Sequence, residues 1–496
     1  MLEGFMGPLN RNNTVAAWLC FLFMGMVFAQ VPKKSGQGGM PNVIVFIADD
    51  ISWNDFGCYG NPFVETPHID SLAAHGLRFN NAVLTTSSCS PSRISILTGR
   101  YPHNTGAAEL HTEPKVAFGS IASELKKKGY YTGQAGKWHM GTLLRQGFDK
   151  IHDSRAENGD GGEEMWVPSI LERDRGKPFF FWFAAYDAHR PWGVNRFSGT
   201  HRPEDVVVPP TLVDDGPTRG DLAKYYDEIK RFDTHIGKVI TTLKKEGVYE
   251  NTLLVVMADN GRPFPRDKTR LYDSGIRTPF IVHWPGRMAT GTSQSLISSV
   301  DLAPTILDVC DAAIPESFQG RSFKELLFRP HTNFRRYAFA EHNWHDHEAH
   351  ERMVRTTDFV YILNSRPELP NQGPADALDS PAFKSLQAKN DKGGLTKAQY
   401  DVFLAPRPKE ELFYIKGDVL QVQNLIGNEE FGQVRGKLRK VLADWMRETR
   451  DNIPDGLTKD WYTRDGGKKI DGNFQIRGEM PGASTGAEKV NVISGF

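Results

Sequence analysis

The stretch NVIVFIADD, residues 42–50, decides which fold class we expect. Branched and aromatic apolar residues run almost without interruption and end in two adjacent carboxylates, Asp49 and Asp50. A short apolar run of this kind is typical of a strand that is buried on both faces of a parallel sheet. The rest of the chain should then supply further strands, together with helices that cover both faces.

Two more runs have the same form: KPFFFWFAAYDAHRPW (177–192), which ends in Asp187 and His189, and NTLLVVMADNG (251–261), which ends in Asp259 and Asn260. A fourth run, RTPFIVHWPG (277–286), has no polar end. Helical patterns alternate with the runs, at residues 68–76, 120–130, 221–247 and 299–311. This alternation predicts an α/β fold around a large, mostly parallel sheet.

The polar strand ends indicate where a functional site would lie. Open α/β sheets bind their ligands beyond the carboxyl ends of the strands. Asp and Asn also cap helices and form turns, so each ending taken alone has a purely structural alternative. Three such endings in one chain favour a site.

The composition limits the possible partners. The 496-residue chain is long enough for two domains. Its 60 lysines and arginines balance its 60 aspartates and glutamates. A balanced charge gives no overall field that would attract nucleic acid, so we expect no nucleic-acid partner. Any recognition of an anion must come from local groups.

Residues 1–29 are predicted to be a signal peptide that is cleaved after Ala29. Arg11 precedes an apolar run of about 15 residues, shorter than the roughly 20 that span a bilayer. We therefore expect an exported protein, periplasmic or secreted, without stable membrane insertion. An uncleaved membrane anchor is the alternative. Residues 30–40 should form a flexible leader.

The chain is expected to divide into a main domain, residues 41–350, and a smaller α+β domain, residues 351–468. Three segments of the smaller domain have distinct patterns: a strand pair at 351–364, a loop at 366–383 and an amphipathic helix at 432–452. Residues 469–496 are polar and rich in glycine, and are expected to form an extended tail.

Beyond the predicted signal peptide, the chain has three cysteines, Cys58, Cys89 and Cys310. So few cysteines do not build a disulfide framework. Cys58 and Cys310 could pair with each other or be buried thiols. Cys89 calls for another reason, because it lies among small polar residues in TTSSCSPSRISILTGR, residues 85–100.

Two sets of side chains could perform chemistry together. Carboxylate and amide oxygens suit a hard cation such as calcium or magnesium, and the candidates are Asp49, Asp50, Asp259 and Asn260. Basic and imidazole groups beside such a cation could hold an oxyanion and protonate a leaving group, and the candidates are Arg93, Lys137, His139, His189 and Lys268. Each of these taken alone could instead be a solvated surface side chain.

The segment CSPSR, residues 89–93, with the tail LTGR, residues 97–100, resembles the signature of the type I, formylglycine-dependent sulfatases. The other motifs follow that family's order along the chain: IADD, CSPSR, GKWHMG, DAHRPW, ADNG and LYDSGIRTPFIVHWPG. The resemblance extends over roughly residues 42–450. It implies an alkaline-phosphatase-like sandwich around the large sheet, with residues 41–350 as the catalytic domain and a smaller C-terminal domain.

The resemblance also implies the cofactors. A formylglycine-generating enzyme, a transient partner, would convert Cys89 to Cα-formylglycine. The hydrated aldehyde would take the sulfate with one hydroxyl and expel it with the help of the other. Calcium would be bound by residue 89 together with Asp49, Asp50, Asp259 and Asn260.

Five further residues would act on the formylglycine and on the sulfate, as the resemblance implies. Arg93 and Lys137 would hold the formylglycine and balance its charge. His139 would contact it and assist the elimination step. His189 and Lys268 would contact the sulfate, with His189 protonating the leaving group.

In its motifs the chain is most similar to the subgroup of heparan N-sulfatase, or sulfamidase, because DNG-x-PFP, SSCSPSR and SVDLAPTILD match it. It departs at Arg262, where many sulfatases have a histidine, and at Lys268, where sulfamidase has an arginine. RTPFIVHWPG is nearer to common O-sulfatases. We expect a sulfatase that acts on a sulfated carbohydrate, a glycosaminoglycan or algal polysaccharide fragment, with N-sulfoglucosamine as one candidate.

The alternatives are an O-sulfatase for marine polysaccharide, a phosphatase or phosphonate hydrolase on the same fold, and a non-catalytic glycan-binding relative. Specificity should lie in loops around the strand ends. There we expect sugar contacts from His111, His345, His347 and Arg352, with Trp344 as a stacking surface, although a solvated loop is the alternative. The histidine spacing matches no zinc signature.

Overall fold

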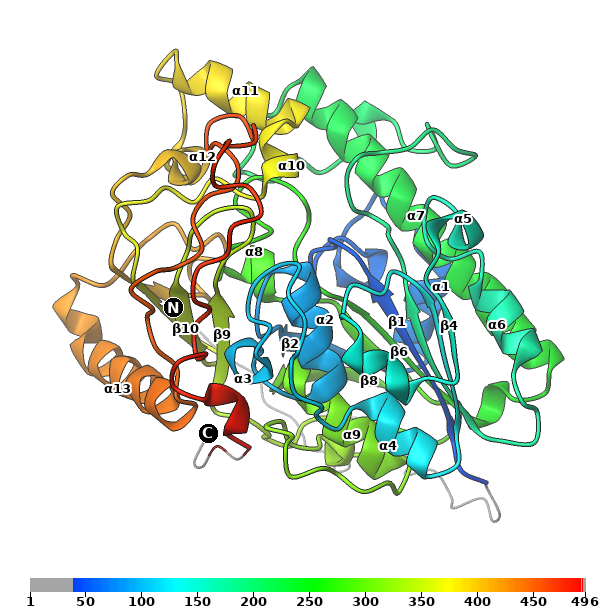
Figure 1. The fold of residues 1–496 in the computed structure, drawn as a ribbon. Coiled ribbons are helices and arrows are strands. Elements are labelled where there is room, and N and C mark those ends of the chain that lie inside the picture. Colours follow the sequence, from blue (N-terminus) through cyan, green and yellow to red (C-terminus); the bar gives the residue numbers. More distant parts are fainter. Residues whose placement is uncertain (1–38, 492, 494–496) are drawn as a thin grey trace, which may run out of the picture.

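The apolar runs form the centre of one eight-stranded sheet in the computed structural model, which describes residues 39–491 and 493 (Figure 1). From edge to edge the strands are β4 (Lys150–His152), β3 (Tyr131–Gly136), β5 (Phe179–Ala184), β1 (Asn42–Ala48), β6 (Thr252–Ala258), β7 (Phe280–His283), β2 (Leu77–Val83) and β8 (Gly291–Ser298). Within this sheet, β7 alone runs antiparallel to its neighbours. The predicted mostly parallel sheet is confirmed.

Strand β1, the stretch on which the fold prediction rests, lies near the middle of the sheet. It pairs in parallel with β5 on one side and β6 on the other, so that Val43 lies opposite both Phe180 and Leu253. All of its residues are buried, and alternate side chains enter two different cores. Burial on both faces explains why the run is continuously apolar.

Helices cover both faces of this sheet (Figure 1). One face packs against α2 (Cys89–Thr98), α4 (Ile121–Lys127) and α9 (Leu302–Val309). The other packs against α1 (Pro67–Ala74), α6 (Trp166–Glu172) and α7 (Gly216–Lys245). Single helical turns complete this part: α3 (Pro102–Thr105), α5 (Arg155–Asn158) and α8 (Asp273–Ile276). The result is the expected three-layer α/β sandwich.

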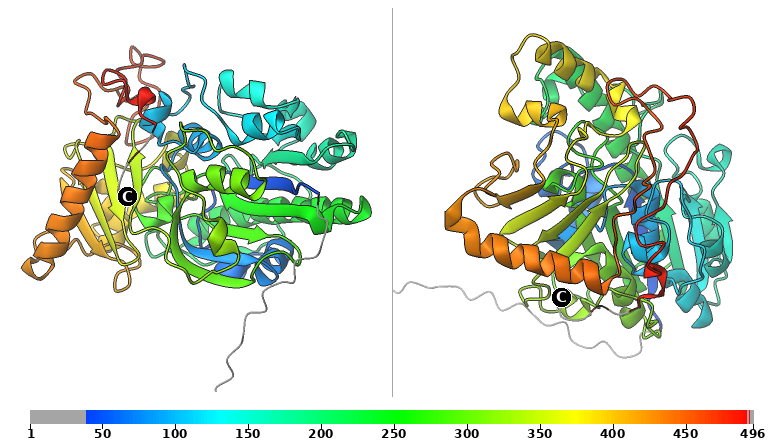
Figure 2. Two further views of the ribbon diagram at one scale, coloured as in Figure 1. Left: turned by 90° about the horizontal axis from the view of Figure 1, so that it is seen from below. Right: turned by 60° about the vertical axis from the view of Figure 1, so that its left-hand side comes forward.

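A second, antiparallel sheet follows, with the order β12 (Glu410–Tyr414), β11 (Phe359–Asn364), β10 (Glu351–Arg355) and β9 (Ala338–His342). The predicted strand pair is β10 and β11, and the predicted amphipathic helix is α13 (Gly432–Glu448). Figure 2 shows α13 lying across this sheet. Leu438, Leu442 and Trp445 of α13 pack on one face, while the other face packs against the large α/β part.

The connection from β11 to β12 contains helices, so the prediction of a loop at residues 366–383 is confirmed for residues 366–374 and 379–380 and wrong for residues 375–378 and 381–383. It holds α10 (Ala375–Leu378), α11 (Pro381–Asn390) and α12 (Lys397–Tyr400). Phe383 and Leu386 of α11 are buried in the same core as α7, and contact with that distant helix stabilises a segment whose own sequence has many loop-forming residues. In Figure 1 these helices lie beyond one end of the large sheet, near α7.

The small sheet bears on the predicted domain boundary between residues 350 and 351. That boundary would separate β9 from its partner β10, whereas a division before β9 keeps the sheet whole. The tail from residue 469 has a single 3-10 turn at Ala487–Lys489 in its described part. It is anchored at Arg477, whose guanidinium lies 4.3 Å from the ring centroids of both Trp344 and Trp461.

The predicted signal peptide and all but the end of the predicted leader lie outside the described residues. Across residues 39–491 and 493, none of the helices combines the length and the apolar character needed to cross a bilayer.

Candidate active site

Adjacent parallel strands bring the sequence motifs to one edge of the large sheet. Asp49 and Asp50 follow β1, and Asp259 and Asn260 follow the neighbouring β6. The segment with Lys137 and His139 follows β3, and His189 lies beyond the end of β5. Because β3, β5, β1 and β6 are parallel and contiguous, their carboxyl ends meet at the same place. The expectation of one site at this edge agrees with the geometry.

Cys89 is the first residue of α2, and its side chain faces the acidic strand ends. The Cys89 Sγ lies 3.6 Å from Asp49 Oδ1 and 3.9 Å from Asp50 Oδ1. The residue is 2% exposed. Burial raises the pKa of the Cys89 thiol well above its ordinary range. An unmodified cysteine here would therefore be a thiol rather than a nucleophilic thiolate.

Side-chain atoms that could bind a metal ion lie close together at Cys89. Ligand atoms of Asp49, Cys89 and Asp259 all lie within 4.8 Å of one another. Asn260 donates to Asp50 Oδ1 over 2.5 Å, while its own Oδ1 is buried and accepts no hydrogen bond from the described residues. A buried oxygen without a donor beside several carboxylates is an environment suited to a hard cation.

Three basic side chains balance the carboxylates. Arg93 Nε donates to Asp259 Oδ2 over 2.7 Å, and its guanidinium also approaches Asp49 at 3.6 Å. Lys137 Nζ forms a short ion pair with Asp49. Lys268 and Asp50 pair in the same way, and both are almost fully buried.

The pKa values follow from this competition between burial and pairing. Burial alone would raise the pKa of Asp49, but Lys137 and Arg93 hold it far below its ordinary value. Asp259 is different, since burial raises its pKa to about 7 despite the contact with Arg93. At Asp259, burial therefore outweighs the pairing with Arg93.

The histidines lie on the side of the candidate active site that opens to the cavity. His111 Nδ1 and His139 Nε2 are 2.8 Å apart. Burial lowers the pKa of both rings, that of His111 to about 4, so this pair is neutral and one ring donates to the other. His189 Nδ1 contacts the carbonyl of Arg190, which can only accept, so Nδ1 carries a proton and Nε2 faces the carboxylates of the site.

An open cavity of about 740 Å³ leads to these groups. Its wall includes Asp49, His111, Lys137, His139 and His189. Arginines and carboxylates line the outer part, which can form many polar contacts with a hydrophilic ligand: Asp153, Arg155, Asp160, Glu228 and Arg231.

The four predicted sugar contacts have different positions. His111 lines the cavity, and His345 Nδ1 lies 2.7 Å from Ser88 Oγ, next to Cys89. His347 lines a separate, much smaller cavity. Arg352 is fully buried and bound to Asp451 over 2.6 and 2.8 Å, so the structure does not bring it to the site. The predicted stacking residue Trp344 is likewise buried, beneath Arg477.

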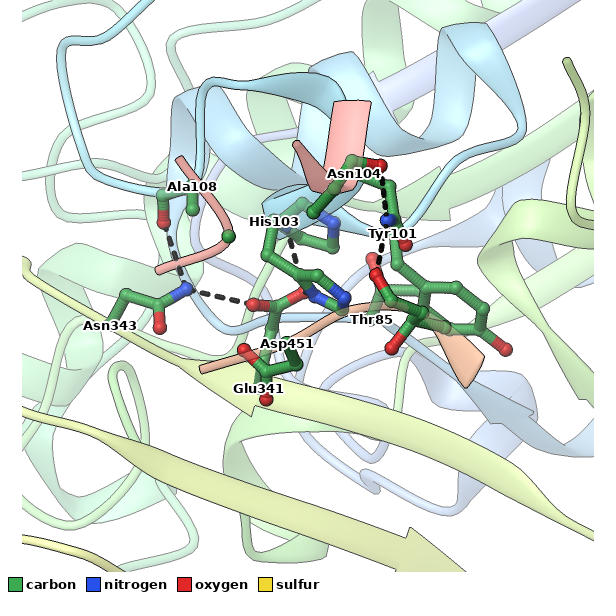
Figure 3. Close-up of polar contacts among 12 residues, drawn as sticks. Thr85, Tyr101, His103, Asn104, Ala108, Glu341, Asn343 and Asp451 are labelled. Carbon is green, nitrogen blue, oxygen red and sulfur yellow. Dashed lines mark hydrogen bonds and ion pairs between the residues drawn. The ribbon is translucent and has the colours of Figure 1, made fainter. Parts of the chain in front are cut away.

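Arg352 donates to Asn343 Oδ1, and Asn343 belongs to a polar network that links the small sheet to α3 and the loop after it (Figure 3). In this network, His103 pairs with Glu341 over 2.8 Å. Asn343 donates to the carbonyl of Ala108 and to Glu341. The network fixes the loop after β9 to the segment that carries His111. The burial and the charge of Arg352 therefore have a structural explanation.

Sequence reasoning missed one acidic side chain near the site. Asp376 of α10 reaches the site from the connection between β11 and β12, and its Oδ2 lies 3.7 Å from His189 Nε2. A lone aspartate in a segment rich in proline and glycine gives no signal of its own, so only the fold could reveal this contact.

Comparison with known proteins agrees with the fold and the motifs. Residues 41–312 match the sulfatase family, and residues 264–365 match the family described as N-sulphoglucosamine sulphohydrolase, C-terminal. The human N-sulphoglucosamine sulphohydrolase is 30% identical over 84% of this chain and 93% of its own length. An ulvan-active sulfatase from Formosa agariphila is 29% identical over 90% of this chain and 83% of its own length.

Solved structures show the same fold at lower identity. A protein solved with D-glucosamine-2-N,6-O-disulfate has a TM-score of 0.64 and 20% identity, and covers 82% of this chain and 98% of its own. A phosphonate monoester hydrolase of Agrobacterium radiobacter has a TM-score of 0.63 and 16% identity, over 84% of this chain and 98% of its own. Fold similarity therefore does not separate sulfate from phosphonate chemistry, whereas the sequence matches do. Because the matched family region covers more than half of the chain, this protein belongs to the sulfatase family, whose members hydrolyse sulfuric esters and sulfamates.

Proposed function

We propose that this chain is an exported, calcium-dependent sulfatase that releases sulfate from a sulfated carbohydrate, with Cys89 matured to formylglycine. The observation that carries the proposal is the position of Cys89. It begins α2, within 4 Å of two carboxylates that Lys137 and the buried Lys268 neutralise. A structural thiol does not need such surroundings, whereas the precursor of an activated nucleophile does.

The residues present fit a calcium ion. The donor set is made of oxygens from Asp49, Asp50, Asp259 and Asn260, and the orphaned Asn260 Oδ1 lacks a partner that a cation would supply. When bound, the ion would lower the pKa of a hydroxyl on residue 89 and polarise the sulfate oxygens.

The chain's own residues have distinct proposed tasks. Arg93 and Lys137 orient residue 89 and the carboxylates around it through the contacts described above. Lys268 supplies a buried positive charge where the sulfate oxygens would lie. His189, when protonated on both ring nitrogens, can donate the Nε2 proton to the leaving group and keep the Nδ1 proton on the carbonyl of Arg190. His139, neutral and hydrogen bonded to His111, can accept a proton from the hydroxyl of residue 89.

Sulfated carbohydrate is the proposed substrate class because several of the sequence relatives are named for a sulfated sugar or polysaccharide. One relative is the human N-sulphoglucosamine sulphohydrolase and another is an ulvan-active sulfatase. The first favours an N-sulfated glucosamine and the second an O-sulfated algal sugar. The match of residues 264–365 to the N-sulphoglucosamine sulphohydrolase C-terminal family supports testing N-sulfoglucosamine first.

The test is release of inorganic sulfate, measured by ion chromatography, after co-expression with a formylglycine-generating enzyme. The panel contains N-sulfoglucosamine, glucosamine 6-sulfate, ulvan oligosaccharides, 4-nitrophenyl sulfate and a phosphonate monoester. Cys89→Ser is the matched control, because it removes the thiol that matures. We expect release from at least one sugar, dependent on Cys89 and abolished by a calcium chelator.

Other results would reject parts of the proposal. Turnover of the phosphonate alone would reject the sulfatase assignment. No turnover of any compound, with mass spectrometry showing formylglycine at position 89, would favour a non-catalytic glycan-binding protein. Release from N-sulfoglucosamine alone would assign the sulfamidase activity, and release only from O-sulfated sugars would reject it.

A further inference from the structure

Asp376 is the acidic group near the site that the proposed chemistry leaves without a task. Its Oδ2 lies 3.7 Å from His189 Nε2, on the side of the ring that faces the site. Both carboxylate oxygens are shielded from solvent, and neither accepts a hydrogen bond from the described residues. A shielded carboxylate without a donor is costly unless something else supplies one.

The position of Asp376 is fixed from several sides. The carboxylate of Asp346 accepts a hydrogen bond from the backbone N–H of Ala375 over 3.0 Å. The residue before Asp346 is His345, which contacts Ser88 beside Cys89. Ala377 and Leu378, on the other side of Asp376, are buried, and Leu378 packs in the core that contains α7. The short helix α10 therefore holds the carboxylate in a set place relative to Cys89.

A second metal ion is a poor explanation for this carboxylate. Oxygens of Asp50 and Asp376 and a ring nitrogen of His189 do lie within 4.8 Å of one another. However, Asp50 already belongs to the proposed calcium site, so only Asp376 and His189 would remain as ligands of a second ion. One carboxylate and one imidazole are too few ligands for a hard cation.

The chemistry of the surrounding groups points to the substrate instead. The positive charges of Lys137, Lys268 and Arg93 make the expected position of the sulfate cationic. The carboxylate of Asp376 lies next to this position, beside the ring of His189. If His189 Nε2 contacts the atom that carries the sulfate, Asp376 lies beside the groups on the neighbouring ring carbon, since adjacent oxygens on a sugar are about one hydrogen-bond length apart. A carboxylate accepts from a hydroxyl or an ammonium group and repels a second sulfate.

We propose that Asp376 is a specificity-determining residue: it accepts a hydrogen bond from a hydroxyl or amino group beside the sulfated position and excludes sugars that carry a second anionic group there. This inference rests on the proposed function and narrows its substrate class. The substrate is then a sugar whose sulfated position has a neutral or cationic neighbour.

The test compares the turnover of a sulfated sugar and of 4-nitrophenyl sulfate by the wild type and its variants. The sugar is the panel member with the highest kcat/KM, and 4-nitrophenyl sulfate offers no hydroxyl beside its sulfate. The variants are Asp376→Asn, which keeps the shape and removes the charge, and Asp379→Asn. Asp379 lies three positions further on, is 81% exposed and pairs with the exposed Lys384, so it is a matched control.

We expect Asp376→Asn to lower kcat/KM for the sugar about 10- to 100-fold more than for 4-nitrophenyl sulfate, the usual size of a hydrogen bond to a charged group. Asp379→Asn should change neither substrate. Relative turnover of a sugar that bears a second sulfate beside the first should rise in Asp376→Asn. Asp376→Ala, checked by circular dichroism for folding, should show the same selectivity change.

Two results would overturn the inference. Equal losses for both substrates would make Asp376 a group that positions His189. A second tightly bound metal ion, present in the wild type and lost in Asp376→Asn, would make it a metal ligand. Failure of the proposed function is distinct from both, because the wild-type enzyme would then release no sulfate from either substrate.

Discussion

Lys268 Nζ lies 2.8 Å from Asp50 Oδ2, although 218 residues separate the two along the chain. Both side chains are almost completely buried. The contact joins the loop after β6 to the end of β1, and it places a fixed positive charge beside Cys89. The balance of charge around Cys89 therefore depends on this pair.

Lys268→Met should therefore destabilise the metal-free protein. Burial alone would lower the pKa of Lys268, but Asp50 raises it above its ordinary value, so the pair is charged. Breaking a buried pair leaves one charge uncompensated and costs about 3–5 kcal/mol. Calorimetry should show a lower Tm that calcium partly restores. Lys384→Met, at an exposed pair with Asp379, is the control. An unchanged Tm without calcium would contradict this account.

Asp259→Asn should weaken calcium binding. The carboxylate is one of the converging ligand groups and pairs with Arg93, so the amide removes charge without changing shape. Affinity for oxygen-ligated calcium depends strongly on the number of charged ligands, and we expect a loss of at least about 100-fold. Isothermal titration with calcium chloride measures it. Asp308→Asn, at a partly exposed pair with Lys324, should bind calcium as the wild type does.

Arg262→Met should weaken calcium binding, although Arg262 is not one of the proposed calcium ligands. Arg262 contacts Asn54 at 2.6 Å, Asp55 at 3.1 Å and Asp267 at 3.4 Å, so it ties the loop after β1 to the loop after β6. These two loops carry the two halves of the proposed metal site. Groups that orient metal ligands typically contribute about 10- to 100-fold in affinity.

We expect saturating calcium to restore most of the kcat of Arg262→Met, which is the readout that separates orientation from direct catalysis. Arg202→Met, at an arginine that is 66% exposed, is the matched control. If kcat stays low at every calcium concentration, Arg262 acts in some other way.

Arg352→Met should reduce stability rather than substrate binding. The guanidinium and the carboxylate of Asp451 are both fully buried and bound to each other, so loss of the arginine should cost about 3–5 kcal/mol. Because Arg352 does not reach the cavity, KM for the sugar should stay within about threefold of the wild-type value. A larger rise in KM for the sugar would instead place Arg352 among the substrate-binding residues.

The effect of Arg352→Met should also depend on pH. Burial alone would raise the pKa of Asp451, but Arg352 holds it below the ordinary value of 3.8. A carboxyl group whose pKa is lowered by folding stabilises the protein above its unfolded pKa, and this contribution is lost as the pH falls. The stability difference between wild type and variant should therefore be largest near neutral pH. It should shrink below about pH 4, which urea titrations at several pH values would measure.

The sequence by itself determined the class of fold and the composition of the centre. A strand buried on both faces must be continuously apolar, and a chain leaving the sheet must become polar, so NVIVFIADD and its counterparts could be recognised locally. The order of motifs around Cys89 was likewise specific enough to indicate a sulfatase, and the family match agrees.

Only the tertiary structure decided which polar residues reach the site. Arg352 lies on β10 in a strand pattern that does not indicate depth, and its partner Asp451 comes 99 positions later. Residues 375–378 and 381–383 are helical where the local sequence predicted a loop, because they pack in the core that contains the distant helix α7. The contact of Asp376 with His189 depends on the same packing of this connection. Contacts between segments far apart in sequence depend on packing free energy and loop closure, which local patterns do not encode.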